Sequence, residues 1–110
     1  MKQYVIDEIR FQDYEKIKTY LDDTFGASGL DGLYWIPVDE ALLCDVQKNH
    51  QDCAPFYMSL ELMPDRLAGE LLVRTRNRMR CDCIRYADKR QRDWLIETMD
   101  DLFDRLGIIT

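Results

Sequence analysis

The sequence lacks any apolar run approaching the roughly 20 residues that a helix needs to cross a bilayer. Its first eight residues become acidic at Asp7 and Glu8 before an apolar segment can form, which is not the pattern of a secretory signal peptide. These absences predict a cytoplasmic protein that does not contact the membrane. In that reducing compartment we expect the four cysteines to be free thiols.

The sequence also lacks the short motifs that mark common active sites. The glycines in residues 26–29 match neither nucleotide-binding pattern, and there is no serine nucleophile elbow and no zinc-protease helix motif. His50 is the sole imidazole, so a Cys–His nucleophilic pair would have to use it, and Cys53 lies too close along the chain for an independently placed pair. These absences favour a non-enzymatic protein. An enzyme whose site is built from ordinary residues remains the alternative.

The composition is globular, with 46% apolar and 33% charged residues in a chain of 110, and we expect one domain over residues 1–110. The net charge of −6 disfavours indiscriminate binding to nucleic acid or anionic membranes. The charge is unevenly distributed, however. Eight basic and two acidic side chains lie in residues 74–92, against seven basic and nineteen acidic side chains elsewhere. The basic segment therefore needs a local explanation.

Apolar periodicity and end signals predict three helices. The first covers residues 12–25 and ends at Gly26, because apolar side chains recur there at steps of three and four. The second covers residues 39–52 and begins at a capping Asp39. The third begins after Asp88, which forms a capping-box pattern with a glutamine three residues later, and ends at Gly107.

Residues 56–86 predict a meander of three antiparallel strands, over residues 56–62, 67–74 and 79–86, with a turn at residues 63–66. A strand over residues 4–9 can extend this sheet. In the first hairpin the predicted pairs are Leu62 with Leu67, Leu60 with Gly69, Met58 with Leu71 and Phe56 with Val73. The fold class is therefore α+β, a three-stranded antiparallel meander packed against three helices.

The register of the second hairpin follows from keeping apolar side chains on one face, because a slip of one residue would reverse every side chain. A loop of odd length satisfies this condition. The pairs of that register are Val73 with Cys81, Leu71 with Cys83 and Arg74 with Arg80.

Four residues form a candidate metal site. His50 and Cys53 are three residues apart on a predicted helix, and Cys81 and Cys83 are two apart on a predicted strand, so each pair shares one face. One histidine and three cysteines suit a tetrahedral zinc site; an iron–sulfur cluster is less well matched. We exclude Cys44, which would point to the opposite side of its helix. The alternative is that these thiols are ordinary core residues, because free cysteine packs as a small apolar side chain.

Arg74, Arg76, Arg78 and Arg80 surround the predicted tip of the second hairpin and form a candidate anion- or partner-binding site. Like charges at opposed positions destabilise a sheet, so an acidic partner, a second copy of the chain or internal acidic groups would have to offset them. Aromatic side chains are not interleaved with these arginines, so a protein partner is favoured over nucleic acid. An apolar pair of Tyr57 and Leu72 on the outer sheet face supports the hypothesis of a homodimer.

The interpretation that these patterns favour is a small, non-enzymatic interaction domain that contacts an anionic or acidic partner through the arginine-rich hairpin. No cofactor is expected for that role. The alternatives are a zinc protein that uses the histidine and three cysteines, and an enzyme whose active site the sequence does not reveal.

Overall fold

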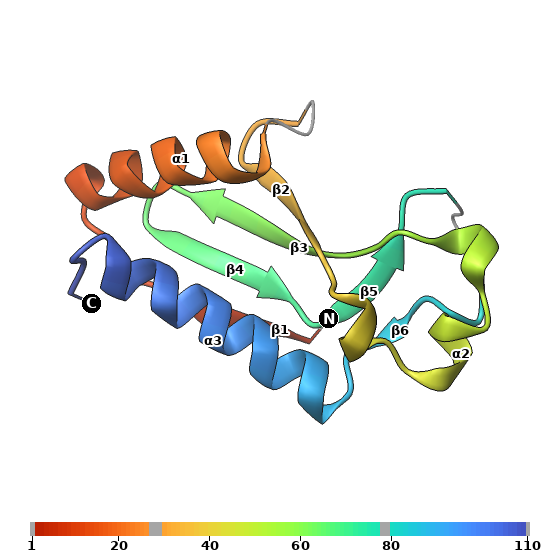
Figure 1. Cartoon of the computed structure of the whole chain (residues 1–110). Coiled ribbons are helices and arrows are strands. Elements are labelled where there is room, and N and C mark those ends of the chain that lie inside the picture. The colour runs from red at the N-terminus through yellow and green to blue at the C-terminus, as the bar shows by residue number, and fades with distance from the viewer. Residues whose placement is uncertain (1, 27–29, 78–79, 110) are drawn as a thin grey trace.

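The computed structural model describes residues 2–26, 30–77 and 80–109 (Figure 1). Within these residues the helices are α1 (Phe11–Phe25), α2 (Asp45–Lys48) and α3 (Lys89–Arg105), with single 3₁₀ turns at Glu40–Leu42 and Gln51–Cys53. The strands are β1 (Gln3–Ile6), β2 (Leu33–Pro37), β3 (Phe56–Met63), β4 (Arg66–Glu70), β5 (Leu72–Thr75) and β6 (Arg85–Tyr86). The predicted α+β class is confirmed. No helix in the described part of the chain has the length and apolar character needed to span a bilayer.

β3 is the central strand of an antiparallel sheet. Its Tyr57 lies between Pro37 of β2 and Arg74 of β5, and its Glu61 pairs with both β2 and β4. β4 and β5 therefore follow one another along the edge of β3 that faces away from β2. Their own outer edges pair with β1 and β6, respectively. The predicted N-terminal strand is thus present as β1.

The register of the first hairpin is confirmed near its turn, where Leu62 pairs with Leu67 and Leu60 with Gly69. The prediction for the far half is wrong. Phe56 pairs with Thr75 instead of Val73, which is a shift of two residues, and the predicted pairing of Met58 with Leu71 is lost as well.

The shift arises at Leu71, where β4 ends and β5 has not yet begun. The Leu71 N–H donates to the Lys2 carbonyl at 3.0 Å, and the Leu71 carbonyl accepts from the Ala87 N–H at 2.9 Å. Both backbone groups are therefore satisfied by distant segments rather than by β3. A register shift of two residues leaves the same side chains on each face of the sheet, so the apolar pattern alone does not reveal it.

The predicted register of the second hairpin is wrong. Leu72 pairs with Tyr86, and Val73 pairs with Arg85 instead of Cys81. Residues 81–84 form a turn, closed by the Ile84 N–H donating to the Cys81 carbonyl at 3.0 Å, so β6 is only two residues long. The predicted pairings of Leu71 with Cys83 and of Arg74 with Arg80 are lost with it.

The single helix predicted over residues 39–52 is also wrong, although Asp39 does cap a turn by accepting from the Ala41 N–H at 2.9 Å. The backbone is extended at Leu43 and Cys44, and α2 then starts afresh. The Gln47 side chain accepts from the Cys44 N–H at 3.0 Å and so closes the new first turn. Helices of this length are marginal in isolation, so local caps of this kind decide where each turn stops.

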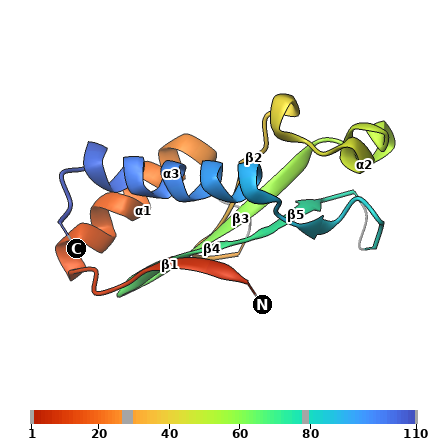
Figure 2. The same cartoon turned by 90° about the horizontal axis from the view of Figure 1, so that it is seen from below.

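The main core lies between the sheet and the pair α1 and α3, which cover one face of it (Figure 2). Met58, Leu67 and Leu95 are fully buried there, and Met99 is 1% exposed. The predicted capping box of α3 is present, with Asp88 and Gln91 exchanging side-chain to backbone hydrogen bonds.

No helix of the described residues covers the second face of the sheet (Figure 2). Trp35 and Tyr57 lie there edge to face, with ring centroids 6.2 Å apart. The predicted apolar pair of Tyr57 with Leu72 is wrong, because Tyr57 lies opposite Arg74 and Leu72 lies opposite Tyr86.

Candidate metal centre

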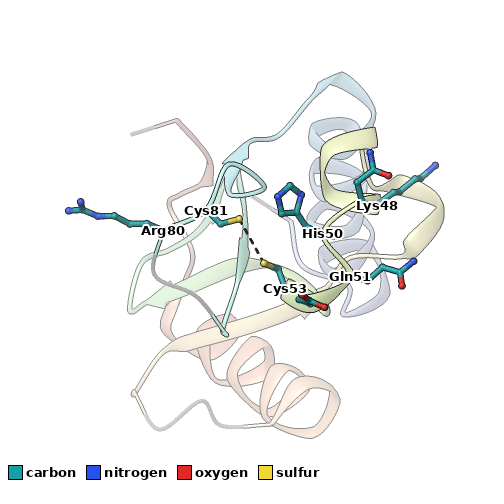
Figure 3. A pocket seen from close by; sticks show the side chains of 8 residues that line it. Lys48, His50, Gln51, Cys53, Arg80 and Cys81 are labelled. Carbon is teal, nitrogen blue, oxygen red and sulfur yellow. Dashed lines mark hydrogen bonds between the residues drawn. The ribbon is translucent and has the colours of Figure 1, made fainter.

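Three cysteines meet where two segments of the chain lie against each other beyond the end of β5. Cys53 ends the 3₁₀ turn Gln51–Cys53, and Cys81 and Cys83 lie in the turn that precedes β6. The three Sγ atoms all lie within 4.8 Å of one another, and those of Cys53 and Cys81 are 3.8 Å apart (Figure 3). Cys44 is not part of this cluster.

The two segments are joined by hydrogen bonds from the end of β5. The Thr75 hydroxyl donates to the Cys53 carbonyl. Two residues later, the Asn77 side chain donates to the Ala54 carbonyl at 3.0 Å. The backbone that follows the Cys53 side chain is thus held against the strand that leads towards the other two cysteines.

His50 lies beside this cluster with one ring nitrogen already bound. Its Nδ1 is 2.5 Å from the Val46 carbonyl oxygen, and a carbonyl oxygen can only accept, so Nδ1 carries the proton of the neutral ring. Nε2 then has a free lone pair. A backbone carbonyl that fixes the tautomer in this way is the usual outer contact of a metal-binding histidine. Figure 3 shows the ring between the two segments, and it lines the same cavity as Cys53 and Cys81.

The three thiols have different surroundings. Cys83 is fully buried, and this burial raises its pKa to about 12. Cys81 is half-buried, and hydrogen bonding from the backbone and the side chain of Cys83 lowers its pKa. The cluster is therefore not a uniform apolar environment, because it lowers the pKa of one thiol and raises the pKa of another.

A chain of buried polar side chains supports Cys83 from the core. The Gln47 side chain donates to the Cys83 carbonyl at 3.2 Å, and its own oxygen accepts from the Gln91 side chain at 2.9 Å. The same Gln91 amide donates to the Leu42 carbonyl. Both glutamines are 1% exposed. The first turn of α3 thus fixes the backbone of one thiol in the cluster.

The sequence pattern predicted the cysteines and His50 as site residues, but it did not predict the hydrogen bonds from the two buried glutamines. The capping-box pattern indicated Gln91, yet it gave no sign that the same side chain also reaches Gln47 across 44 positions. Gln47 had no local signal, because its partners become neighbours only when the chain folds. A buried glutamine between two turns is visible only in the structure.

A cavity of about 500 Å³ opens beside the cluster. Its lining includes Cys53, Cys81 and His50, together with the two cationic residues Lys48 and Arg80. Figure 3 shows the Lys48 and Arg80 side chains extending away from the thiols, so the two cations do not converge on a shared anion site.

The arginines proposed as a partner site do not form one cluster. Arg74 pairs with Glu70, with Nε 2.5 Å from the carboxylate, and this pairing raises the pKa of Arg74. Arg76 lies over the rings of Trp35 and Tyr57, at 5.6 and 6.0 Å from their centroids. Arg80 is exposed. Arg78, the remaining member of the predicted site, lies outside the described residues.

No protein-family model, curated protein or solved structure matches the chain.

Proposed function

We propose that this chain is a zinc-binding protein in which Cys53, Cys81, Cys83 and His50 hold one zinc ion in a structural role. The observation that carries the proposal is the convergence of three thiol sulfurs within 4.8 Å from two segments that are 28 residues apart. Zinc in proteins is most often bound by four nitrogen and sulfur ligands in a tetrahedron.

The sulfur spacing fits a tetrahedral site with thiolate ligands. With Zn–S bonds of about 2.3 Å, two ligands of a tetrahedral site have their sulfur atoms about 3.8 Å apart. The Cys53 and Cys81 sulfur atoms already have that separation. His50 is not among the groups whose ligand atoms lie within 4.8 Å of one another, so its Nε2 would have to move towards the three sulfurs to supply the fourth ligand.

The alternative of ordinary core thiols accounts less well for this arrangement. Cys53 and Cys83 would fit it, since both are buried. Cys81, however, is half-buried and lines a cavity, and its surroundings lower the pKa of its thiol, whose deprotonated form is the one that binds metal. His50, whose Nδ1 contacts the Val46 carbonyl, also lines this cavity and does not belong to the apolar core.

Four protein ligands leave no open coordination position, so the proposed role is structural. The ion would join the turns that carry His50 and Cys53 to the loop that carries Cys81 and Cys83. We propose a cytoplasmic location for the protein, where the free thiols needed for this site persist.

Metal analysis of the full chain purified without chelator tests the proposal. We expect about one zinc per chain in the wild type and in Cys44→Ser, whose sulfur lies outside the cluster. Cys53→Ser and Cys83→Ser should bind far less, and cobalt(II) in place of zinc should give the intense visible absorption of a tetrahedral thiolate site. Less than about a tenth of an equivalent of zinc in the wild type, with none taken up on addition, would refute the proposal.

A second candidate function, contact with an acidic protein partner, is favoured by the position of Arg76. Its guanidinium is exposed, lies over two aromatic rings and has no ion-pair partner among the described residues. Stacking on Trp35 and Tyr57 orders the side chain and leaves its N–H groups available for carboxylates.

Binding of a polyglutamate peptide to the Trp94→Phe variant, in which Trp35 is the remaining tryptophan, followed by tryptophan fluorescence, tests this candidate. We expect Arg76→Ala to weaken binding about tenfold, the equivalent of one charge-assisted hydrogen bond, whereas Arg105→Ala, the same change in α3, should have little effect. Stronger binding of a single-stranded oligonucleotide would instead assign a nucleic-acid partner. Light scattering tests the remaining hypothesis, self-association as a homodimer.

A further inference from the structure

Cys53 and Cys81 form a thiol pair that is close enough for direct chemistry. Their sulfur atoms are 3.8 Å apart, whereas a disulfide requires about 2.05 Å. Neither residue lies in an α-helix or a strand. Modest rotation of the two side chains therefore brings the sulfurs together without breaking a helix or the sheet.

The position of the cavity distinguishes this pair from the other thiols. Cys53 and Cys81 line the cavity of about 500 Å³, and Cys81 is half-buried, so a small oxidant reaches its sulfur. Cys83 is fully buried and does not line that cavity. It is also only two residues from Cys81, and a disulfide between them would close a small strained ring. Cys53 is therefore the better partner for an oxidised Cys81.

We propose that Cys81 is an oxidation site for hydrogen peroxide and that Cys53 resolves it to a reversible disulfide. The Cys81 thiolate attacks one peroxide oxygen, the O–O bond breaks, and Cys81 sulfenic acid and hydroxide form. The Cys53 sulfur then attacks the Cys81 sulfur, the S–S bond forms, and a second hydroxide leaves. With two protons, the two hydroxides become two waters, so two thiols lose the two electrons that the peroxide gains.

Disulfide formation would also release the zinc, and this part of the inference rests on the proposed function. The ion stays Zn²⁺ throughout, but it loses two of its four ligands. Cys83 and His50 alone do not complete a closed zinc site. The centre would then exchange a metal cross-link between the two segments for a covalent one.

Peptide mapping of the peroxide-treated full chain, without reduction, tests the disulfide. Trypsin releases Cys81 and Cys83 together in residues 81–85 and Cys53 in residues 49–66, so fragmentation of the cross-linked pair must identify the sulfur. We expect a bond from Cys53 to Cys81 in the wild type, in Cys44→Ser and in Cys83→Ser, and none in Cys81→Ser. Dithiothreitol should reverse it.

A zinc-sensitive dye added to the same reaction follows the metal, and a chelator-treated sample provides the metal-free arm. We expect one zinc released per disulfide. A bond from Cys53 to Cys83, or only over-oxidised Cys81, in the wild type would overturn the assignment of the pair. A disulfide that leaves zinc bound would overturn the release step. If the protein never takes up zinc but still forms the disulfide between Cys53 and Cys81 in the metal-free arm, the oxidation of this pair is supported. The proposed zinc-binding function is then refuted.

Discussion

Removal of zinc by a strong chelator is expected to lower the melting temperature of the full chain by about 15 °C. A ligand present at 1,000 times its Kd stabilises the folded state by about 4 kcal/mol. For a chain of roughly 100 residues, each kcal/mol shifts the melting temperature by about 4 °C or more. Differential scanning calorimetry with free zinc held at a fixed concentration measures the change.

Below the melting temperature, removal of zinc should destabilise only the segments that carry the proposed ligands. Two of the proposed ligands, Cys53 and Cys83, belong to the buried core, but both lie outside α1, α3 and the strands that form its main part. Hydrogen exchange of the chelated protein should therefore speed up in residues 44–54 and 80–86, while the amides of β3, β4 and α3 stay protected.

The control is Cys44→Ser, which should lose as much stability on chelation as the wild type. Cys53→Ser should melt at the same temperature with and without chelator, because it has little zinc to lose. A wild-type melting temperature that the chelator leaves unchanged would contradict a structural role for zinc.

Local signals predicted the parts of the fold that local interactions determine. The capping box at Asp88 and the turn at residues 63–66 each depend on residues close together in sequence, and both are present. The end of α1 at Gly26, where φ is +72°, follows from one residue. In each case the deciding contact lies within a few positions along the chain.

The second hairpin could not be predicted in the same way. Its register depends on the break at Leu71, and that break is stabilised by Lys2 and Ala87, which are distant in sequence. Two registers that differ by an even number of residues place the same apolar side chains on the same face. The alternation that selected the pairing of Val73 with Cys81 therefore could not exclude the observed one.

The sequence spacing of the candidate ligands predicted the members of the site, even though the helix and the strand predicted to carry them were wrong. A spacing of three residues brings His50 and Cys53 to one side of a 3₁₀ turn as it does in an α-helix. Two residues between Cys81 and Cys83 keep their side chains near each other in a turn as in a strand. What spacing could not supply was the contact between these two pairs, which depends on Thr75, Asn77 and Gln47.

Replacing Gly32 with alanine is the second change for which we expect a large effect. Gly32 immediately precedes β2 and has a φ of +80°, in the left-handed region that costs a residue with a side chain about 1–2 kcal/mol. An added Cβ would also lie 2.6 Å from the Leu62 carbonyl oxygen. The Gly32 carbonyl accepts from the N–H of the same Leu62 at 2.7 Å, so the two backbones cannot separate without breaking that bond.

We therefore expect Gly32→Ala to reduce the free energy of unfolding by about 2–5 kcal/mol, as the sum of backbone strain and overpacking against a rigid partner. Gly26 and Gly107 provide matched controls, because both have positive φ and neither has an atom within 4 Å of an added Cβ. Gly26→Ala and Gly107→Ala should each cost only the strain, about 1–2 kcal/mol. Urea unfolding of the three variants separates the contributions. If Gly32→Ala costs no more than the controls, the close approach of the β2 entry to β3 is not a constraint on the fold.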